Sequence, residues 1–266
     1  LTKQTHNEIA LKQLAPHLGK NSVVCTLQNG IPEEYVAKII GKERTVGGIV
    51  GWGATYCGPG VSELTSDVSA MRFEIGELDG TKSERIEAIA ALLNLVGTCV
   101  VVENLLGLRW AKVIQNATLS GMSAALGATY ADILDDEKAT ACAAYVGNEI
   151  VQIVRKLEIQ LEDLVPGWSY YDLAFSDQLG LEKAKEWLRE YFHPHRSLKA
   201  SMLQDMEKGT PSEIDYIVGI CSEWGKKVGV STPICDTIIE IVKDFESGKI
   251  PLPTMSLLNR FDLDGK

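Results

Sequence analysis

Hydrophobic and polar positions follow one pattern up to about residue 103 and another after it. In the first part, short apolar runs bounded by Gly, Pro or Asn alternate with segments in which apolar residues recur at helical spacing. The runs predict strands at 22–27, 45–56 (one strand or two), 61–65, 71–78 and 98–103. Helices are predicted at 6–18, 32–40 and 83–96, the last with Ser83 as its N-cap and Gly97 as its stop.

After residue 103 the strand patterns end and only helical spacing continues. Helices are predicted at 105–126, 131–157, 181–192, 197–208, 212–228 and 233–247. The change near Glu103 predicts an α/β domain at 1–103 and an all-α domain at 104–266. The stretch 164–180 carries Trp168, Tyr170, Tyr171 and Phe175 with weak periodicity, so we expect an insertion that packs on the helices or on a partner chain.

Composition narrows the classes of function. The 266 residues are 45% hydrophobic and carry a net charge of −10, values that fit a globular protein and argue against a nucleic-acid-binding face. No apolar run reaches the roughly 20 residues that a membrane span needs. The six cysteines form no CxxC pair, which favours a reduced, cytoplasmic protein, and His193 and His195 are too few to predict a metal site.

Two glycine-containing motifs are candidate ligand sites. The segment from Gly51 to Cys57 half resembles a dinucleotide loop, but strand-like residues follow it, so glycines in a twisted strand pair explain it better. Asn29-Gly30 follows a predicted strand, where ligands bind in open α/β sheets. A plain turn is the favoured interpretation of Asn29-Gly30 from local sequence alone.

Polar residues also recur on the first predicted helix of the second domain. Lys112, Asn116 and Ser120 are spaced i, i+4 and i+8, which predicts one polar stripe on an otherwise apolar helix. A lysine there needs an ion pair or chemistry, and a solvated face is an equally good interpretation. Further along, Thr210 and Glu213 are spaced as a capping box around Pro211, and Thr232 is predicted to cap the last helix.

Taken together, these motifs resemble the ketopantoate reductase (2-dehydropantoate 2-reductase) family. The matching pieces are Lys3, LQNG ending at Gly30, the Lys112/Asn116 helix, and the tail GVSTPICDTIIEIVK. The segment SMLQD…EID matches too, with Ser201, Asp205 and Glu213. The resemblance covers most of the chain and implies an α/β plus all-α fold. Part of an NADP-binding Rossmann-like domain would come first. A helical substrate-binding and dimerisation domain, like the C-terminal domain of 6-phosphogluconate dehydrogenase, would follow it.

Three features depart from the family pattern. The GxGxxG strand–turn–helix is absent, and since one βαβ unit takes about 30 residues or more, we expect roughly 70 residues to be missing. Together with Leu1 in place of Met, this predicts a fragment that is itself inactive. Ser120 stands where the family often has a second asparagine, and the stretch 164–196 is longer than the family's usual link.

The resemblance also implies a reaction, namely hydride transfer from NADPH to the keto carbon of 2-dehydropantoate, giving pantoate for pantothenate biosynthesis. Lys112 would be the general acid, Glu213 would hold the substrate hydroxyl and the lysine, and Asn116, Ser120 and Ser201 would bind the substrate. Lys3, Asn29 and Gly30 would lie at the cofactor. The expected partners are a small 2-oxo acid and a second copy of the chain, without nucleic acid, membrane or metal.

Two alternatives remain open at this point. The replacement at Ser120 and the long link favour a related NADPH-dependent reductase of another 2-oxo acid. The absent glycine-rich loop favours a non-catalytic helical interaction or dimerisation module.

Overall fold

The structure, a computed structural model, describes residues 2–263 and divides into two compact units, Leu1–Arg109 and Trp110–Lys266. The division falls within helix α4 (Leu105–Gln115). The strands of the first unit are β1 (Val24–Thr26), β2 (Thr45–Val50), β3 (Ala54–Gly58), β4 (Val61–Leu64), β5 (Arg72–Glu77) and β6 (Thr98–Val101). Its helices are α1 (Asn7–Leu14), α2 (Glu33–Ile40) and α3 (Glu84–Leu93). Each strand and helix predicted for this part of the chain is confirmed.

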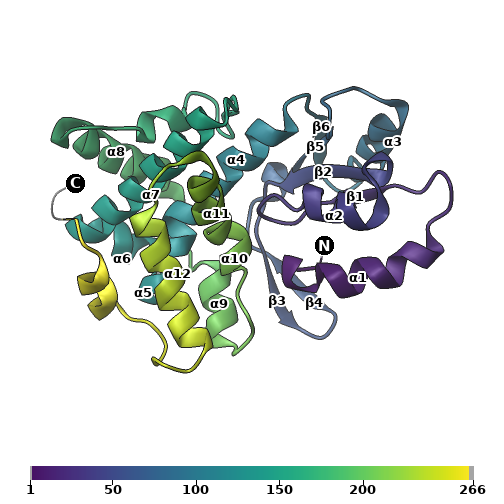
Figure 1. The fold of residues 1–266 in the computed structure, drawn as a ribbon. Helices are drawn as coiled ribbons and strands as arrows, with labels where there is room; N and C mark the ends of the chain where they lie inside the picture. Colours follow the sequence, from purple (N-terminus) through teal and green to yellow (C-terminus); the bar gives the residue numbers. More distant parts are fainter. Residues whose placement is uncertain (1, 264–266) are drawn as a thin grey trace. The chain divides into compact units, whose positions relative to one another are not determined.

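Four of these strands form a mixed sheet in the order β1-β2-β5-β6 (Figure 1). β1 pairs in parallel with β2, and β5 pairs in parallel with β6, while β2 and β5 run antiparallel. Each parallel pair is joined through a helix, α2 for the first and α3 for the second, as parallel connections require. Val46 and Ile75 of the sheet pack with Ile86 and Ala90 of α3 in one buried cluster.

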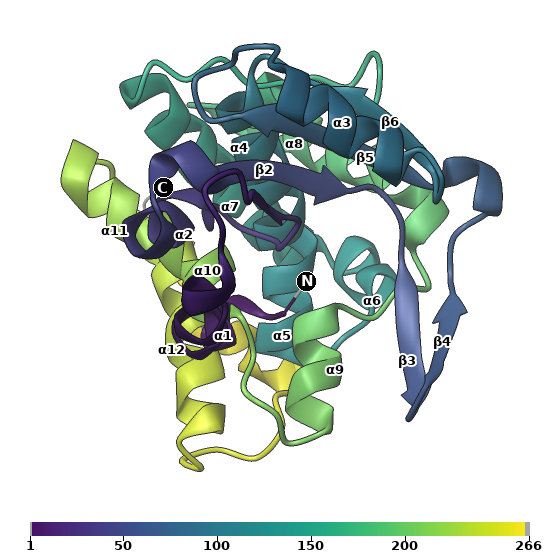
Figure 2. The ribbon, with the colours of Figure 1, turned by 90° about the vertical axis from the view of Figure 1, so that its right-hand side faces the viewer.

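β3 and β4 form a separate antiparallel hairpin that projects from the four-stranded sheet (Figures 1 and 2). Gly51 and Gly53 lie where the chain passes from β2 to β3. A Cβ on Gly53 would lie 2.6 Å from the hydroxyl oxygen of Thr65, and one on Gly51 would lie 3.2 Å from the carbonyl oxygen of Arg72. Close approach to a backbone carbonyl at Gly51 and to a side-chain hydroxyl at Gly53 therefore explains these glycines, and the dinucleotide-loop interpretation of this motif does not hold.

The second unit is helical, as predicted. Its helices are the end of α4, α5 (Met122–Leu126), α6 (Tyr130–Asp135), α7 (Glu137–Lys156), α8 (Gln178–Tyr191), α9 (Ser201–Glu207), α10 (Ile214–Ile217), α11 (Gly219–Val228) and α12 (Pro233–Glu246). α7 contacts α6, α8, α11 and α12, and most of its residues are buried (Figure 1). This long helix is the centre around which the unit packs.

Three predicted continuous helices are interrupted. The pattern over 131–157 comprises α6 and α7, because Asp136 takes an extended conformation and its carboxylate accepts a hydrogen bond from the Ala139 N–H at 2.8 Å, which starts a new helix. The pattern over 212–228 comprises α10 and α11, which meet at Val218 and Gly219. The pattern over 105–126 contains a π-helical segment, Asn116–Gly121.

The aromatic segment packs on a helix of its own chain. Trp168 and Tyr170 lie against Trp187 and Tyr191 of α8, with ring centroids 5.5–5.8 Å apart. Tyr170 is completely buried. Of the two predicted environments for this insertion, the helices are therefore confirmed.

A carboxylate from α7 caps α12. Thr232 occupies the N-cap position as predicted, but its hydroxyl donates to Asp236 at 3.4 Å and makes no capping bond. The carboxylate of Glu149 instead accepts hydrogen bonds from the N–H groups of Ile234 at 2.8 Å and Cys235 at 3.0 Å. Glu149 is buried, so these charge-assisted bonds tie α12 to α7.

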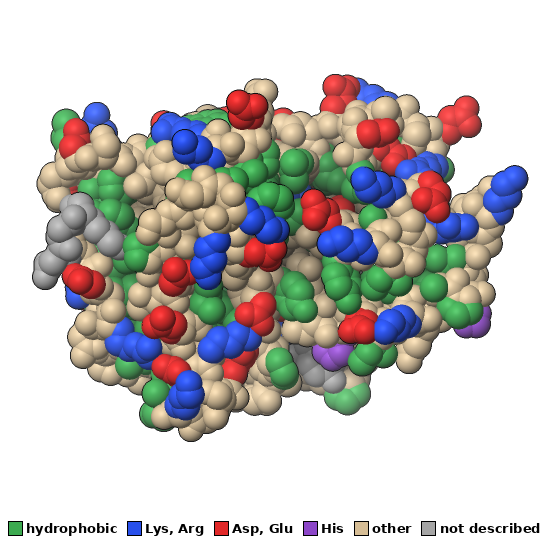
Figure 3. Space-filling view, viewed as in Figure 1, with side chains coloured by type: hydrophobic (Ala, Val, Ile, Leu, Met, Phe, Trp, Pro, Cys, Tyr) green, Lys and Arg blue, Asp and Glu red, His purple; other side chains and the backbone are tan. Residues whose placement is uncertain are grey.

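Among residues 2–263, no helix has both the length and the apolar character that crossing a bilayer requires. The same residues contain no group of three or more His, Cys, Asp and Glu side chains that could hold a metal ion. On the face shown in Figure 3, basic and acidic side chains are interspersed rather than gathered by sign. The net negative charge is therefore not concentrated in a patch on that face.

Candidate active site

The loop after β1 is held by its backbone carbonyl groups. The Arg109 guanidinium donates to the carbonyl oxygens of Thr26 at 3.1 Å and Gln28 at 2.5 Å. The Gln4 side chain donates to the carbonyl oxygen of Asn29 at 2.6 Å, and Gly30 is buried with a φ of +78°. The Asn29 side chain is exposed and makes no hydrogen bond within the described residues, so its amide group is available to a ligand.

Lys3 lies in the segment that contacts this loop. It directly precedes Gln4, and the backbone carbonyl of Thr2 accepts a hydrogen bond from the Gln28 side chain. The structure therefore brings the segments that carry the predicted cofactor residues Lys3, Asn29 and Gly30 side by side within the first unit.

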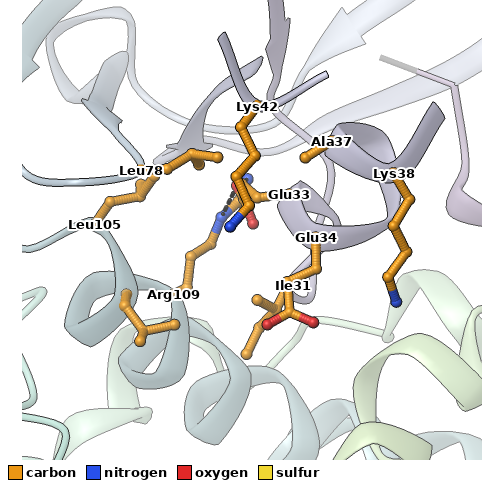
Figure 4. A pocket seen from close by; sticks show the side chains of 10 residues that line it. Ile31, Glu33, Glu34, Ala37, Lys38, Lys42, Leu78, Leu105 and Arg109 are labelled. Atoms are coloured by element: carbon orange, nitrogen blue, oxygen red, sulfur yellow. Dashed lines mark hydrogen bonds and ion pairs between the residues drawn. The ribbon is translucent and has the colours of Figure 1, made fainter. Parts of the chain in front are cut away.

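Arg109 was not predicted from the sequence. Its side chain is 1% exposed, and besides the two carbonyl groups it binds the Glu33 carboxylate, with Nε 2.7 Å from Oε1 (Figure 4). Glu33 begins α2, where a negative charge is favoured by the helix dipole, and its Oε2 has no hydrogen-bond partner among the described residues. The available signal was an arginine in the apolar run LLGLRWA, which needs a buried partner.

A cavity of about 510 Å³ lies beside the Arg109–Glu33 pair (Figure 4). It has the volume of a small-molecule site, and its walls combine leucine and isoleucine side chains with Lys38 and Lys42. None of the predicted site residues is among the described residues that line it. The predicted site residues form two groups, one on the loop of the first unit and one on the helices of the second.

In the second unit, Lys112 is half-buried on α4 and donates a hydrogen bond to Gln115 Oε1 at 2.7 Å. Gln115 Nε2 in turn donates to the Tyr191 hydroxyl at 3.3 Å, and Tyr191 Oη lies 2.7 Å from Tyr170 Oη. Gln115 and the two tyrosines were not predicted as site residues.

The π-helical segment changes the predicted polar stripe. The Thr118 hydroxyl donates to the carbonyl oxygens of Ile114 at 2.9 Å and Gln115 at 3.1 Å. It thus provides a hydrogen bond to carbonyl groups at the point where the regular α-helical hydrogen bonds stop. Because a π-helical turn is wider than an α-helical one, Ser120 no longer lies on the helix face that the i, i+4 spacing predicted. Asn116 is half-buried and its side chain makes no hydrogen bond within the described residues.

Ser120 is buried and already has a partner. Its Oγ lies 2.7 Å from the hydroxyl oxygen of Tyr130, itself almost inaccessible to solvent. Burial raises the pKa of the Tyr130 hydroxyl, and the bond to Ser120 partly offsets that rise. The pair is neutral and has no counterpart in the sequence-based prediction.

The predicted capping box at Thr210–Glu213 is wrong. The helix begins later, at Ile214, and Glu213 stands at its N-cap position without a capping bond. The Thr210 hydroxyl donates to the Asp205 carbonyl at 3.1 Å. The carboxylate of Glu246 on α12 binds both the N–H and the hydroxyl of Ser212, so 210–213 is an anchored turn rather than a first helical turn. Glu213 is buried and loses the structural explanation that the sequence offered.

The elements that carry these residues adjoin one another. Ser201 begins α9, is exposed, and its hydroxyl makes no hydrogen bond within the described part of the chain. α9 and α10 both pack against the π-helical segment that begins at Asn116. The second unit therefore places Asn116, Ser201 and Glu213 on neighbouring elements, with two unused polar side chains among them.

Two family models match the chain. The model described as "Ketopantoate reductase PanE/ApbA C terminal" matches residues 104–246, more than half of the chain. The model described as "Ketopantoate reductase PanE/ApbA" matches residues 1–80. The chain belongs to the ketopantoate reductase family. The resemblance inferred from the motifs is confirmed, as is the Rossmann-like domain followed by a helical one.

Curated relatives within the ketopantoate reductase family are longer than this chain. The 2-dehydropantoate 2-reductase of Mesorhizobium japonicum is 28% identical over 256 residues, which cover 88% of this chain and 72% of the relative. That of Pyrococcus horikoshii is 29% identical, covering 92% of this chain and 74% of the relative. At the level of the family, the chain is thus an oxidoreductase.

Solved structures show the same fold. D-mandelate dehydrogenase with NADH and anilino(oxo)acetate is 25% identical with a TM-score of 0.77, covering 93% of this chain and 75% of that one. A PanE/ApbA family ketopantoate reductase from Ralstonia eutropha JMP134 is 20% identical with a TM-score of 0.76, covering 93% and 74%. The first of these structures contains a nicotinamide dinucleotide together with anilino(oxo)acetate.

Proposed function

We propose that the product of the complete gene reduces a 2-oxo acid with NADPH, and that 2-dehydropantoate is its substrate. The observation that carries this proposal is the set of unused polar side chains around the half-buried Lys112 helix. Asn116 is half-buried and its side chain has no partner among the described residues, so its amide group can both donate to and accept from a ligand.

The proposed roles follow from charge and hydrogen-bonding capacity. Lys112 donates the proton to the carbonyl oxygen of the substrate and stabilises the negative charge that develops there. Asn116 and Ser201 bind the substrate, and the Glu213 carboxylate accepts a hydrogen bond from its hydroxyl group. These residues all lie in the second unit.

NADPH supplies the hydride when it is bound. The free amide of Asn29, on a loop whose carbonyl groups are already held, suits the carboxamide end of a nicotinamide. Lys3, in the neighbouring segment, would hold a negatively charged part of the cofactor. The chain contains no GxGxxG motif for the dinucleotide phosphates, so we expect the 266 residues alone to bind NADPH weakly.

A second candidate is a related reductase with a different 2-oxo acid substrate. The buried Ser120–Tyr130 pair favours it, because the Ser120 hydroxyl is already engaged and a bulky ring lies beside the position where the family often has an asparagine. The similarity to a D-mandelate dehydrogenase structure supports an aromatic 2-oxo acid in this case.

A substrate panel separates these two candidates. We expect NADPH oxidation by the complete gene product to be fastest with 2-dehydropantoate, compared at equal concentration with phenylglyoxylate and 4-methyl-2-oxopentanoate. The measurement is kcat/KM from absorbance at the NADPH band. A preference for phenylglyoxylate would establish the second candidate, and no turnover of any 2-oxo acid would favour the non-catalytic module.

The variant Glu213→Gln tests whether Glu213 has the substrate-binding role that the family resemblance implies. We expect kcat/KM for the 2-oxo acid to fall by about tenfold or more, because about 1.4 kcal/mol of charge-assisted hydrogen bonding is lost in the transition state. The melting temperature should change little, because glutamine has nearly the same size and shape as the buried Glu213 side chain. Steady-state kinetics and thermal unfolding are measured on the same protein.

Glu149→Gln is the matched control, because Glu149 is also a buried glutamate of the second unit but caps α12. It should lower the melting temperature and leave kcat/KM near that of the wild type. The proposed role of Glu213 would be rejected if the two variants showed the reverse pattern.

A further inference from the structure

A continuous hydrogen-bonded chain joins Lys112 to the aromatic segment. The Lys112 ammonium donates to Gln115 Oε1 at 2.7 Å, Gln115 Nε2 donates to Tyr191 Oη at 3.3 Å, and Tyr191 Oη lies 2.7 Å from Tyr170 Oη. All four residues belong to the second unit. The hydrogen-bonded chain therefore runs from α4 to α8 and on to the aromatic segment, to which the family resemblance assigned no role.

Donor and acceptor roles are consistent along this chain. An ammonium group can only donate, so the amide oxygen of Gln115 must face Lys112 and its NH₂ group must face the tyrosine. Tyr191 accepts that bond and is left with its own proton to donate to Tyr170. The ammonium group thus determines the orientation of the amide, since reversing the Gln115 amide would set its NH₂ group against Lys112 and break that bond.

The far end of the chain is rigid. Tyr191 is buried and its ring stacks on that of Trp187, with centroids 4.5 Å apart and planes within 9°. Tyr170 has no exposed surface and its ring packs against the same two side chains. The two hydroxyl groups are therefore held by the packing of their rings, and they can hold Gln115 in turn.

A neutral acceptor suits a catalytic ammonium group. Gln115 lies three residues after Lys112, one helical turn away, so both side chains leave α4 on the same side. An amide oxygen orients the ammonium group without cancelling its charge, which a carboxylate would do. The bond to Gln115 thus orients the ammonium group and adds no negative charge beside it.

We propose that Gln115, Tyr191 and Tyr170 are positioning residues that fix the direction of the Lys112 ammonium group. Within the aromatic segment, Tyr170 then acts on Lys112 through its hydroxyl group, which the packing of its ring holds in place. This inference rests on the proposed role of Lys112 as general acid.

The test compares three variants of the complete gene product. Gln115→Met keeps the length of the side chain and removes the acceptor, and we expect kcat to fall about tenfold with the KM for NADPH within about twofold. Tyr191→Phe removes only the next hydroxyl, and we expect a smaller fall in kcat, about threefold. A misplaced general acid slows the chemical step and leaves cofactor binding intact.

Tyr171→Phe is the matched control. Its hydroxyl also makes two hydrogen bonds, donating to the Ile159 carbonyl at 3.1 Å and accepting from the Leu161 N–H at 3.1 Å, but neither leads to Lys112. We expect its kcat to equal that of the wild type. Equal losses of kcat in Tyr171→Phe and Tyr191→Phe would show that the hydrogen-bonded chain has only a structural role. A wild-type kcat in Gln115→Met would show the same.

Lys112→Ala, measured in the same series, keeps the two hypotheses apart. A collapse of kcat in Lys112→Ala together with a normal Gln115→Met variant overturns the positioning role alone. A wild-type kcat in Lys112→Ala overturns the proposed function and this inference together. Because Tyr191→Phe deletes a single oxygen atom, the test holds even if Gln115→Met does not fold.

Discussion

Replacing Lys112 with alanine in the complete gene product is expected to lower kcat by roughly 10²–10⁴-fold, the usual contribution of a general acid. The KM for NADPH should change little, because the lysine is proposed to act on the carbonyl oxygen and not on the cofactor. The half-buried position of Lys112 on α4 and its orientation by Gln115 are the physical basis of this expectation. Steady-state kinetics with the preferred 2-oxo acid provide the measurement.

Lys185→Ala is a suitable control for this variant. Lys185 is also a poorly exposed lysine of the second unit, but its ammonium group pairs with Glu137 at 2.6 Å and Glu182 at 2.8 Å. Its loss should change stability and leave kcat near the wild-type value. If the two lysine variants retained the same activity, Lys112 would be a structural residue.

The second large effect concerns stability and can be measured on the 266-residue chain itself. Arg109→Met is expected to lower the free energy of unfolding of the first unit by about 3–5 kcal/mol, because it leaves the buried Glu33 carboxylate without its partner. It also removes the donors to the carbonyl oxygens of Thr26 and Gln28. Urea denaturation followed by circular dichroism gives the value.

Arg85→Met is the matched control for this experiment. Arg85 also binds a carboxylate, Glu77, with two nitrogens and a backbone carbonyl, that of Glu43, with the third. Its side chain is 34% exposed, against 1% for Arg109, and Glu77 keeps a hydrogen bond from the Ser83 hydroxyl, so we expect a smaller loss than in Arg109→Met. A loss in Arg109→Met no larger than in Arg85→Met would contradict the importance assigned to the buried pair.

Local sequence was sufficient wherever one short-range interaction decides an element. Ser83 caps α3 as predicted, accepting a hydrogen bond from the Ile86 N–H at 3.3 Å, because both partners lie within one turn. The alternation of strands and helices up to residue 103 was predictable for a similar reason, since burial on one face sets the period of each element.

Where a distant residue competes for the same group, local sequence was misleading. Thr210 and Glu213 have the spacing of a capping box, but the Glu246 carboxylate, from another helix, takes the N–H and hydroxyl of Ser212 between them. Thr232 stands at its predicted position, yet Glu149 caps the helix. No periodicity over a dozen residues contains the information about such partners.

The candidate site could be predicted only in part, because spacing along a helix is visible in the sequence and contacts between distant residues are not. Lys112, Asn116 and Ser120 were identified by spacing along one helix, which the sequence displays directly. The π-helical segment that separates Ser120 from the other two depends on hydrogen bonds of Thr118 to carbonyl groups, which spacing does not reveal. Gln115 and Tyr191 are far apart along the chain, so their pairing appears only in the folded protein.

The β3–β4 hairpin has a consequence for the rate at which the first unit folds. β2 and β5 pair antiparallel, with Val50 opposite Phe73, and the whole hairpin lies in the stretch of chain between them. A hairpin forms within microseconds from local contacts, and once Ala54 pairs with Leu64 the ends of β2 and β5 are already close. Most of the entropy loss on closing that long loop therefore occurs when the hairpin forms, before the central strands of the sheet pair. An exposed, projecting ribbon thus shortens the search for the register on which the buried sheet depends.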